Sequence, residues 1–95
     1  MTMAISQKTA DFFAATQILE NNQADPESLF QLGTLFSTGA QGIEIDLIEA
    51  HKWFNLAALK GSSEAHLCRS EVAGDMSRAE IAEAQRQARA WLANA

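Results

Sequence analysis

Three side chains in this chain are good nitrogen or sulfur ligands for a metal ion: His51, His66 and Cys68. A cysteine becomes a nucleophile when the fold brings an imidazole close enough to favour the thiolate, and His51 is the candidate base for Cys68. No third residue that would orient His51 can be named. His66 and Cys68 are two positions apart, so on a helix they diverge, and structural zinc normally needs four ligands. We therefore expect no metal and no cofactor, and we keep a small cysteine-dependent enzyme as the unfavoured alternative.

The acidic residues provide two close pairs that could act as acid and base, Glu44 with Asp46 and Glu80 with Glu83. Asp46 and Glu80 are expected to cap helices, and the other two carboxylates suit solvated faces. The glycines of the loop 39–42 follow a predicted helix and precede no Lys-Ser/Thr pair, so they do not form a phosphate-binding loop. We expect no catalytic residue and a protein that is not an enzyme.

Length and charge restrict the class of partner. Ninety-five residues form a single domain, 1–95, and 47% hydrophobic with 20% charged residues is ordinary globular composition. The net charge of −5 argues against nucleic acid and anionic membranes, which attract clustered positive charge. The single cysteine fits a reducing compartment, so we expect a cytoplasmic protein whose partner is another protein.

The elements that would position these residues are all helices. Tyrosine is absent, valine occurs once and alanine is abundant, which favours helix over strand. The patterns predict about five helices in an all-α fold, over 10–21 and then within the segments 25–38, 46–61, 62–73 and 77–93. The starts at Asp25-Pro26, Asp46, Ser62 or Ser63, and the capping box Ser77 to Glu80 mark the last four.

Apolar residues at helical spacing predict which faces turn inward. Gly33 lies inside a helix, which costs about 1 kcal/mol against alanine, and we interpret it as a point where the facing helix, with Ala57 and Ala58, comes close. Trp53 is at the margin of its stripe, where it packs against a neighbouring hairpin or, if exposed, anchors a partner. The predicted inward residues are Leu29, Leu32, Leu35, Phe36, Leu47, Ala50, Phe54, Ala57, Ala58, Ala65, Cys68, Val72, Ile81, Ala84, Ala88, Trp91 and Leu92.

One segment carries a many-position pattern, formed by Leu32-Gly33, Leu35-Phe36, Gly39, Gly42-Ile43, Asp46, Ala50, Trp53-Phe54, Ala57-Ala58 and Gly61. Residues 25–61 thereby resemble a Sel-one-like repeat, a relative of the tetratricopeptide repeat, with one extra loop residue and Ile43 in place of the usual valine. Residues 62–93 resemble a degenerate, capping unit of the same kind. The resemblance implies a short α-solenoid of stacked antiparallel helix hairpins.

Proteins of that family are typically adaptors or scaffolds, so the resemblance implies a non-catalytic interaction module for a peptide or helix of a partner protein. The leading helix of each hairpin would line the inner surface. The candidate contact residues are Phe30, Gln31, Thr34, His66, Arg69 and Ser70. The alternative is a structural homo-oligomer held through the N-terminal helix, with Phe12, Phe13 and Ile18 as anchors.

Overall fold

The computed structural model of the chain describes residues 25–94. This part holds four α-helices, α2 (Pro26–Thr38), α3 (Leu47–Leu59), α4 (Ser63–Ala73) and α5 (Arg78–Ala93), and a short 3-10 turn, η1 (Ala40–Gly42), with no strand. The predicted all-α class is confirmed. The helix predicted at 10–21, with its anchors Phe12, Phe13 and Ile18, lies outside the described residues. Within the described part, no helix has the length and apolar character needed to cross a membrane.

Side chains at the helix starts explain why the helices begin where they do. In each of the four, the residue before the helix accepts a hydrogen bond from a backbone N–H in the first turn, which satisfies an otherwise unpaired donor. These N-cap residues are Asp25, Asp46, Ser62 and Ser77. At α5 the bond is reciprocal, since the Glu80 carboxylate accepts from the Ser77 N–H at 2.8 Å, so the predicted capping box is confirmed. Gly39, with φ of 74°, ends α2.

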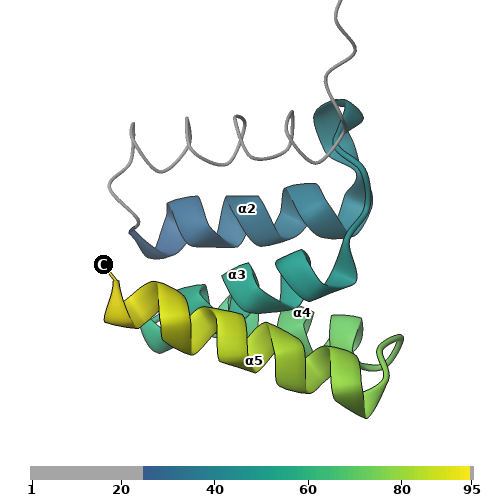
Figure 1. Cartoon of the computed structure of the whole chain (residues 1–95). Coiled ribbons are helices and arrows are strands. Elements are labelled where there is room, and N and C mark those ends of the chain that lie inside the picture. Colours follow the sequence, from purple (N-terminus) through teal and green to yellow (C-terminus); the bar gives the residue numbers. More distant parts are fainter. Residues whose placement is uncertain (1–24, 95) are drawn as a thin grey trace, which may run out of the picture.

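Helix α3 is the centre of the molecule. α2 runs antiparallel to it as the other arm of a hairpin, and α4 and α5 also pack against it (Figure 1). α4 and α5 contact α3 far more extensively than they contact each other. The two helices of the expected second hairpin therefore do not pack closely together. The reason lies in α4, whose only buried residues are Ala65 and Val72, too small a surface to hold a second helix.

The core lies mainly between α2 and α3, where the predicted stripes are buried. Gly33 is covered by the ring of Phe54, and a Cβ atom there would lie 2.5–2.8 Å from three of its ring carbons. The close approach at Gly33 is therefore made by an aromatic ring, and the ring rather than Ala57 or Ala58 is nearest. The buried apolar residues are Leu29, Leu32, Leu35, Phe36, Ile43, Ala50, Trp53, Phe54, Leu56, Ala57, Ala58, Ala65, Val72, Ala84 and Ala88.

Two tryptophans join α5 to α3. Trp53 is only 5% exposed, and its ring meets the edge of Trp91 at 5.8 Å between centroids, so Trp53 is a packing residue rather than an exposed anchor. The Lys52 ammonium lies 4.6 Å from the centre of the Trp53 ring. The prediction for Leu92 is wrong: it is 42% exposed, because Trp91 occupies the position that faces α3 and the next residue points away.

Candidate functional site

Three of the predicted contact residues, Phe30, Gln31 and Thr34, line one shallow cavity of about 360 Å³. They lie three and four positions apart and so share one face of α2. The cavity, here called the α2 groove, is lined by Glu27, Phe30, Gln31, Thr34, Leu35 and Gln41. Its wall combines an aromatic ring and a leucine with two amides, a hydroxyl and a carboxylate. This composition suits a segment with one apolar side chain and polar neighbours.

Phe30 is held in place by its neighbours. Its ring contacts that of Phe54 on α3, with centroids 5.6 Å apart and planes tilted by 52°. On the same helix, the Thr34 hydroxyl donates to the Phe30 carbonyl at 3.1 Å. The Phe30 ring is thus packed against α3 on one side, and with Leu35 it forms the apolar part of the α2 groove.

Gln41 closes the α2 groove at the end of the helix. Its φ of 60° is in the left-handed region, between Gly39 and Gly42, which also have positive φ. Such a conformation costs a residue with a Cβ of the order of 1 kcal/mol, and it brings η1 back toward the end of α2. The sequence pattern indicates only a connecting loop here and does not point to Gln41, because a positive φ at a non-glycine residue has no local sequence signal.

On α4, a pair of hydrogen bonds positions the guanidinium of Arg69. Its Nη1 donates to Oδ1 of Asn55 on α3 at 2.7 Å, and its Nη2 lies 3.1 Å from Nδ1 of His66. A guanidinium can only donate, so Nδ1 of His66 is the acceptor and its ring proton is on Nε2. Ser70, the remaining candidate on this helix, is exposed.

His51 lies one helical turn before Asn55 and is 3% exposed. Burial, and then the positive charge of Arg69, lower the pKa of His51 below its usual 6.5, so the ring is neutral at neutral pH. Its buried Nδ1 has no hydrogen-bond partner among the described residues. We call Asn55, His66 and Arg69, together with His51, the α4 polar cluster.

Two consecutive residues of α3 connect the α2 groove with the α4 polar cluster. Phe54 contacts Phe30, and Asn55 accepts the hydrogen bond from Arg69. The α4 candidates do not line the α2 groove itself, so the predicted contact residues form two sets on either side of this α3 turn. Asn55 was missed by sequence analysis, although it is the only polar residue in the run 53–58, a signal that would have drawn attention to it.

Cys68 has the properties of a structural cysteine. It is half-buried, and burial, followed by the charges of Glu71 and Glu64, raises the pKa of its thiol. A catalytic cysteine needs the opposite shift, toward the thiolate. No cluster of three or more His, Cys, Asp or Glu residues capable of holding a metal ion occurs within 25–94.

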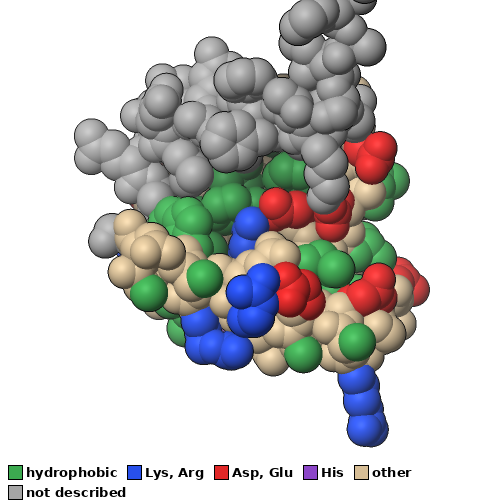
Figure 2. Space-filling view, viewed as in Figure 1, with side chains coloured by type: hydrophobic (Ala, Val, Ile, Leu, Met, Phe, Trp, Pro, Cys, Tyr) green, Lys and Arg blue, Asp and Glu red, His purple; other side chains and the backbone are tan. Residues whose placement is uncertain are grey.

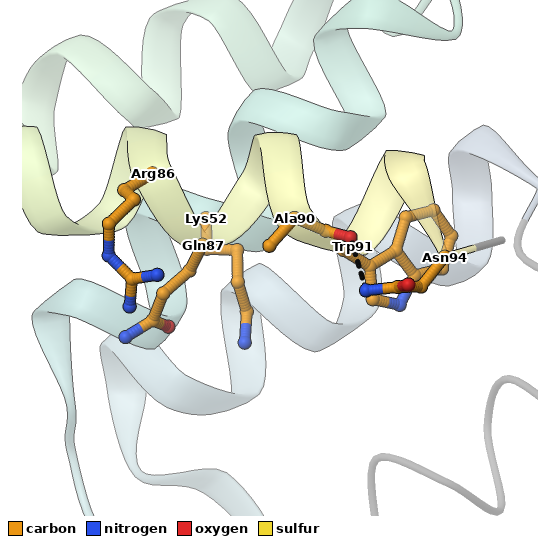
Figure 3. A pocket seen from close by; sticks show the side chains of 6 residues that line it. All are labelled: Lys52, Arg86, Gln87, Ala90, Trp91 and Asn94. Carbon is orange, nitrogen blue, oxygen red and sulfur yellow. Dashed lines mark hydrogen bonds between the residues drawn. The ribbon is translucent and has the colours of Figure 1, made fainter.

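A second cavity, of about 390 Å³, lies between α3 and α5, but its charged groups are already paired. It is lined by Lys52, Arg86, Gln87, Ala90, Trp91 and Asn94 (Figure 3). Arg86 and Gln87 both donate to Glu83, which lowers the pKa of that carboxyl to about 2, and Lys52 forms an ion pair with Glu49. On the face seen in Figure 2, basic and acidic side chains accordingly lie next to each other. This cavity offers a ligand little unsatisfied polarity.

The chain was compared with models of protein families, with curated proteins and with solved structures, and none of them matched.

Proposed function

We propose that this protein is a non-catalytic interaction module that binds a peptide or helix of a partner protein. The observation that supports this most directly is the placement of the α2 groove and the α4 polar cluster on either side of one turn of α3. Consecutive residues of α3 thus support an aromatic contact, through Phe54 and Phe30, and an oriented guanidinium, through Asn55 and Arg69. Peptide recognition typically uses a small number of apolar anchors, which provide affinity, together with polar groups, which determine the register of the peptide.

The resemblance of residues 25–61 to a Sel-one-like repeat supports the same function, and we propose that membership together with a capping role for 62–93. The α2–α3 hairpin accounts for two positions of the pattern at once, since Gly33 provides the space that Phe54 fills. The protonated thiol of Cys68 supports a role without catalysis. A single free cysteine also agrees with our proposal of a cytoplasmic location.

The experiment is affinity capture with the full chain as bait, comparing the wild type with the double variant Phe30→Ala, Arg69→Ala. We expect the double variant to lose specific partners by about tenfold or more, because one change removes the apolar contact and the other the oriented cation. The matched control is Gln85→Ala, Arg89→Ala, since both residues are exposed on α5. Equal recovery of partners by the wild type and the double variant would contradict the proposal, provided that circular dichroism shows both to be folded.

A further inference from the structure

Arg69 carries a positive charge that no described carboxylate balances. The ion pairs of the described residues join Lys52 with Glu49 and Arg86 with Glu83. Arg69 forms no ion pair with a described carboxylate, and its side-chain partners are Asn55 and His66. Arg86 is largely exposed, whereas Arg69 is half-buried between α3 and α4. A partly desolvated cation without a counter-ion is costly, and an incoming anion relieves that cost.

The hydrogen bonds of Arg69 orient the guanidinium and leave most of it available. Asn55 and His66 use two of its five N–H donors, and both are neutral acceptors, so they position the group without neutralising it. Its other neighbour, His51, is neutral as well. Three donors of the planar guanidinium remain, and a guanidinium can bind a carboxylate with two parallel hydrogen bonds.

We propose that Arg69 binds the carboxylate of an aspartate or glutamate side chain in the partner segment whose apolar residue occupies the α2 groove. This inference rests on the proposed function and specifies the chemistry of the ligand. A side chain fits better than a C-terminal carboxylate, because the backbone groups of α3 and α4 around Arg69 are used within their helices. A chain end brought between those helices would leave its own amides without partners, whereas a side-chain carboxylate reaches inward on a flexible stem.

The test begins with short random peptides displayed on phage through their C-termini, so that no peptide has a free terminal carboxylate, and selected on the full chain. The selected peptides are synthesised with an amidated C-terminus and titrated by fluorescence anisotropy. Each is paired with a version in which its acidic residue is replaced by the corresponding amide. The protein variants are Arg69→Gln, which removes the charge, Arg69→Lys, which keeps the charge but not the planar pair of donors, and Arg69→Glu, which reverses the charge. The control is the exposed Arg89→Gln.

We expect the selected peptides to share an acidic residue. Replacing it by the amide should weaken binding to the wild type by about tenfold or more but change binding to Arg69→Gln little, while Arg89→Gln behaves as the wild type. A peptide carrying lysine in place of the acidic residue should bind Arg69→Glu better than it binds the wild type. Arg69→Lys should lie between wild type and Arg69→Gln.

Three outcomes would overturn the inference in distinguishable ways. Peptides that lose affinity for Phe30→Ala but are indifferent to their own acidic residue would leave the proposed function standing and exclude the carboxylate contact. Binding that requires a free C-terminus, tested with unamidated versions of the same peptides, would assign the charge to a chain end. Failure to select any peptide on the folded chain would contradict the proposed function and this inference with it.

Discussion

Gly33 is the residue that allows α2 and α3 to approach each other. A single added methyl group would meet the Phe54 ring at distances that real Cβ atoms do not adopt, so either the ring or the helix must move. Helical propensity favours alanine over glycine by about 1 kcal/mol, yet here the steric cost opposes it. Because the added Cβ atom would lie only 2.5–2.8 Å from the Phe54 ring, we expect the steric cost to be larger.

We therefore predict that Gly33→Ala lowers the free energy of unfolding by about 1–3 kcal/mol and that Gly33→Leu lowers it further. Gln31→Ala, at an exposed position two residues away, should stay within about 0.5 kcal/mol of the wild type. Urea unfolding followed by circular dichroism measures all three. Phe54→Leu should make Gly33→Ala less harmful, because a smaller side chain gives the new methyl group room. A Gly33→Ala variant as stable as Gln31→Ala would contradict this account.

His51 predicts how stability depends on pH. Its pKa is lowered in the folded protein, so the unfolded chain takes up the proton more readily. The contribution of His51 is fully present above its ordinary pKa of 6.5 and is lost as the pH falls below that value. We expect urea midpoints to decrease on acidification from neutral pH. His51→Leu should remove part of this decrease. A decrease of the same size in His51→Leu would rule out His51 as its source.

At the scale of single residues, the role of a side chain can be predicted from the sequence where it acts on its own helix, but not where it depends on a neighbouring helix. The N-caps Asp25 and Ser77 were predicted because an acceptor side chain acts on its own first turn. Gly33 was recognised as a close approach, but its neighbour was not, since which ring covers it depends on how α3 is rotated. Asn55 has its role only because α4 places Arg69 beside it.

At the scale of elements, α5 depends on a few contacts with α3. Only Ala84 and Ala88 of its sixteen residues are buried, and Trp91 provides the large ring that meets Trp53. The small alanines let the helices come close, and the two tryptophan rings meet edge to face. The amphipathic pattern predicted that α5 exists. It did not predict that α5 packs against α3 rather than α4, because both helices have apolar residues against which α5 could pack.

We predict that Trp91→Ala lowers the free energy of unfolding by about 2–4 kcal/mol, somewhat less than for a fully buried tryptophan since Trp91 is half-buried. The neighbouring Leu92→Ala should change it by about 0.5 kcal/mol or less, because that side chain is exposed. Chemical denaturation of both variants gives the comparison. Equal losses would show that the two positions are used alike and that the assigned face of α5 is wrong.

At the scale of the whole molecule, every other described helix depends on α3. Seven of its thirteen residues are buried, and α2, α4 and α5 all pack on it (Figure 1). Elements that share one support are expected to unfold together. The all-α class followed from composition and periodicity, whereas this radial arrangement needed the structure, because a stack of hairpins and helices grouped around one member have the same hydrophobic pattern.

We predict a single cooperative transition for the described helices. Circular dichroism follows all helices, and tryptophan fluorescence follows the Trp53–Trp91 contact between α3 and α5. The two signals should give the same urea midpoint. A fluorescence change that precedes the loss of helix would mean that α5 detaches separately and that α3 does not unite the fold.

The central position of α3 also separates the supporting part of the molecule from the part that is free to change. Substitutions on α3 disturb several interfaces at once, so divergence between relatives should be slow there. The outward-facing residues of α2 and α4 make fewer contacts with the core. Directed evolution toward new ligands can therefore randomise Gln31, Thr34 and Ser70 while α3 is kept constant.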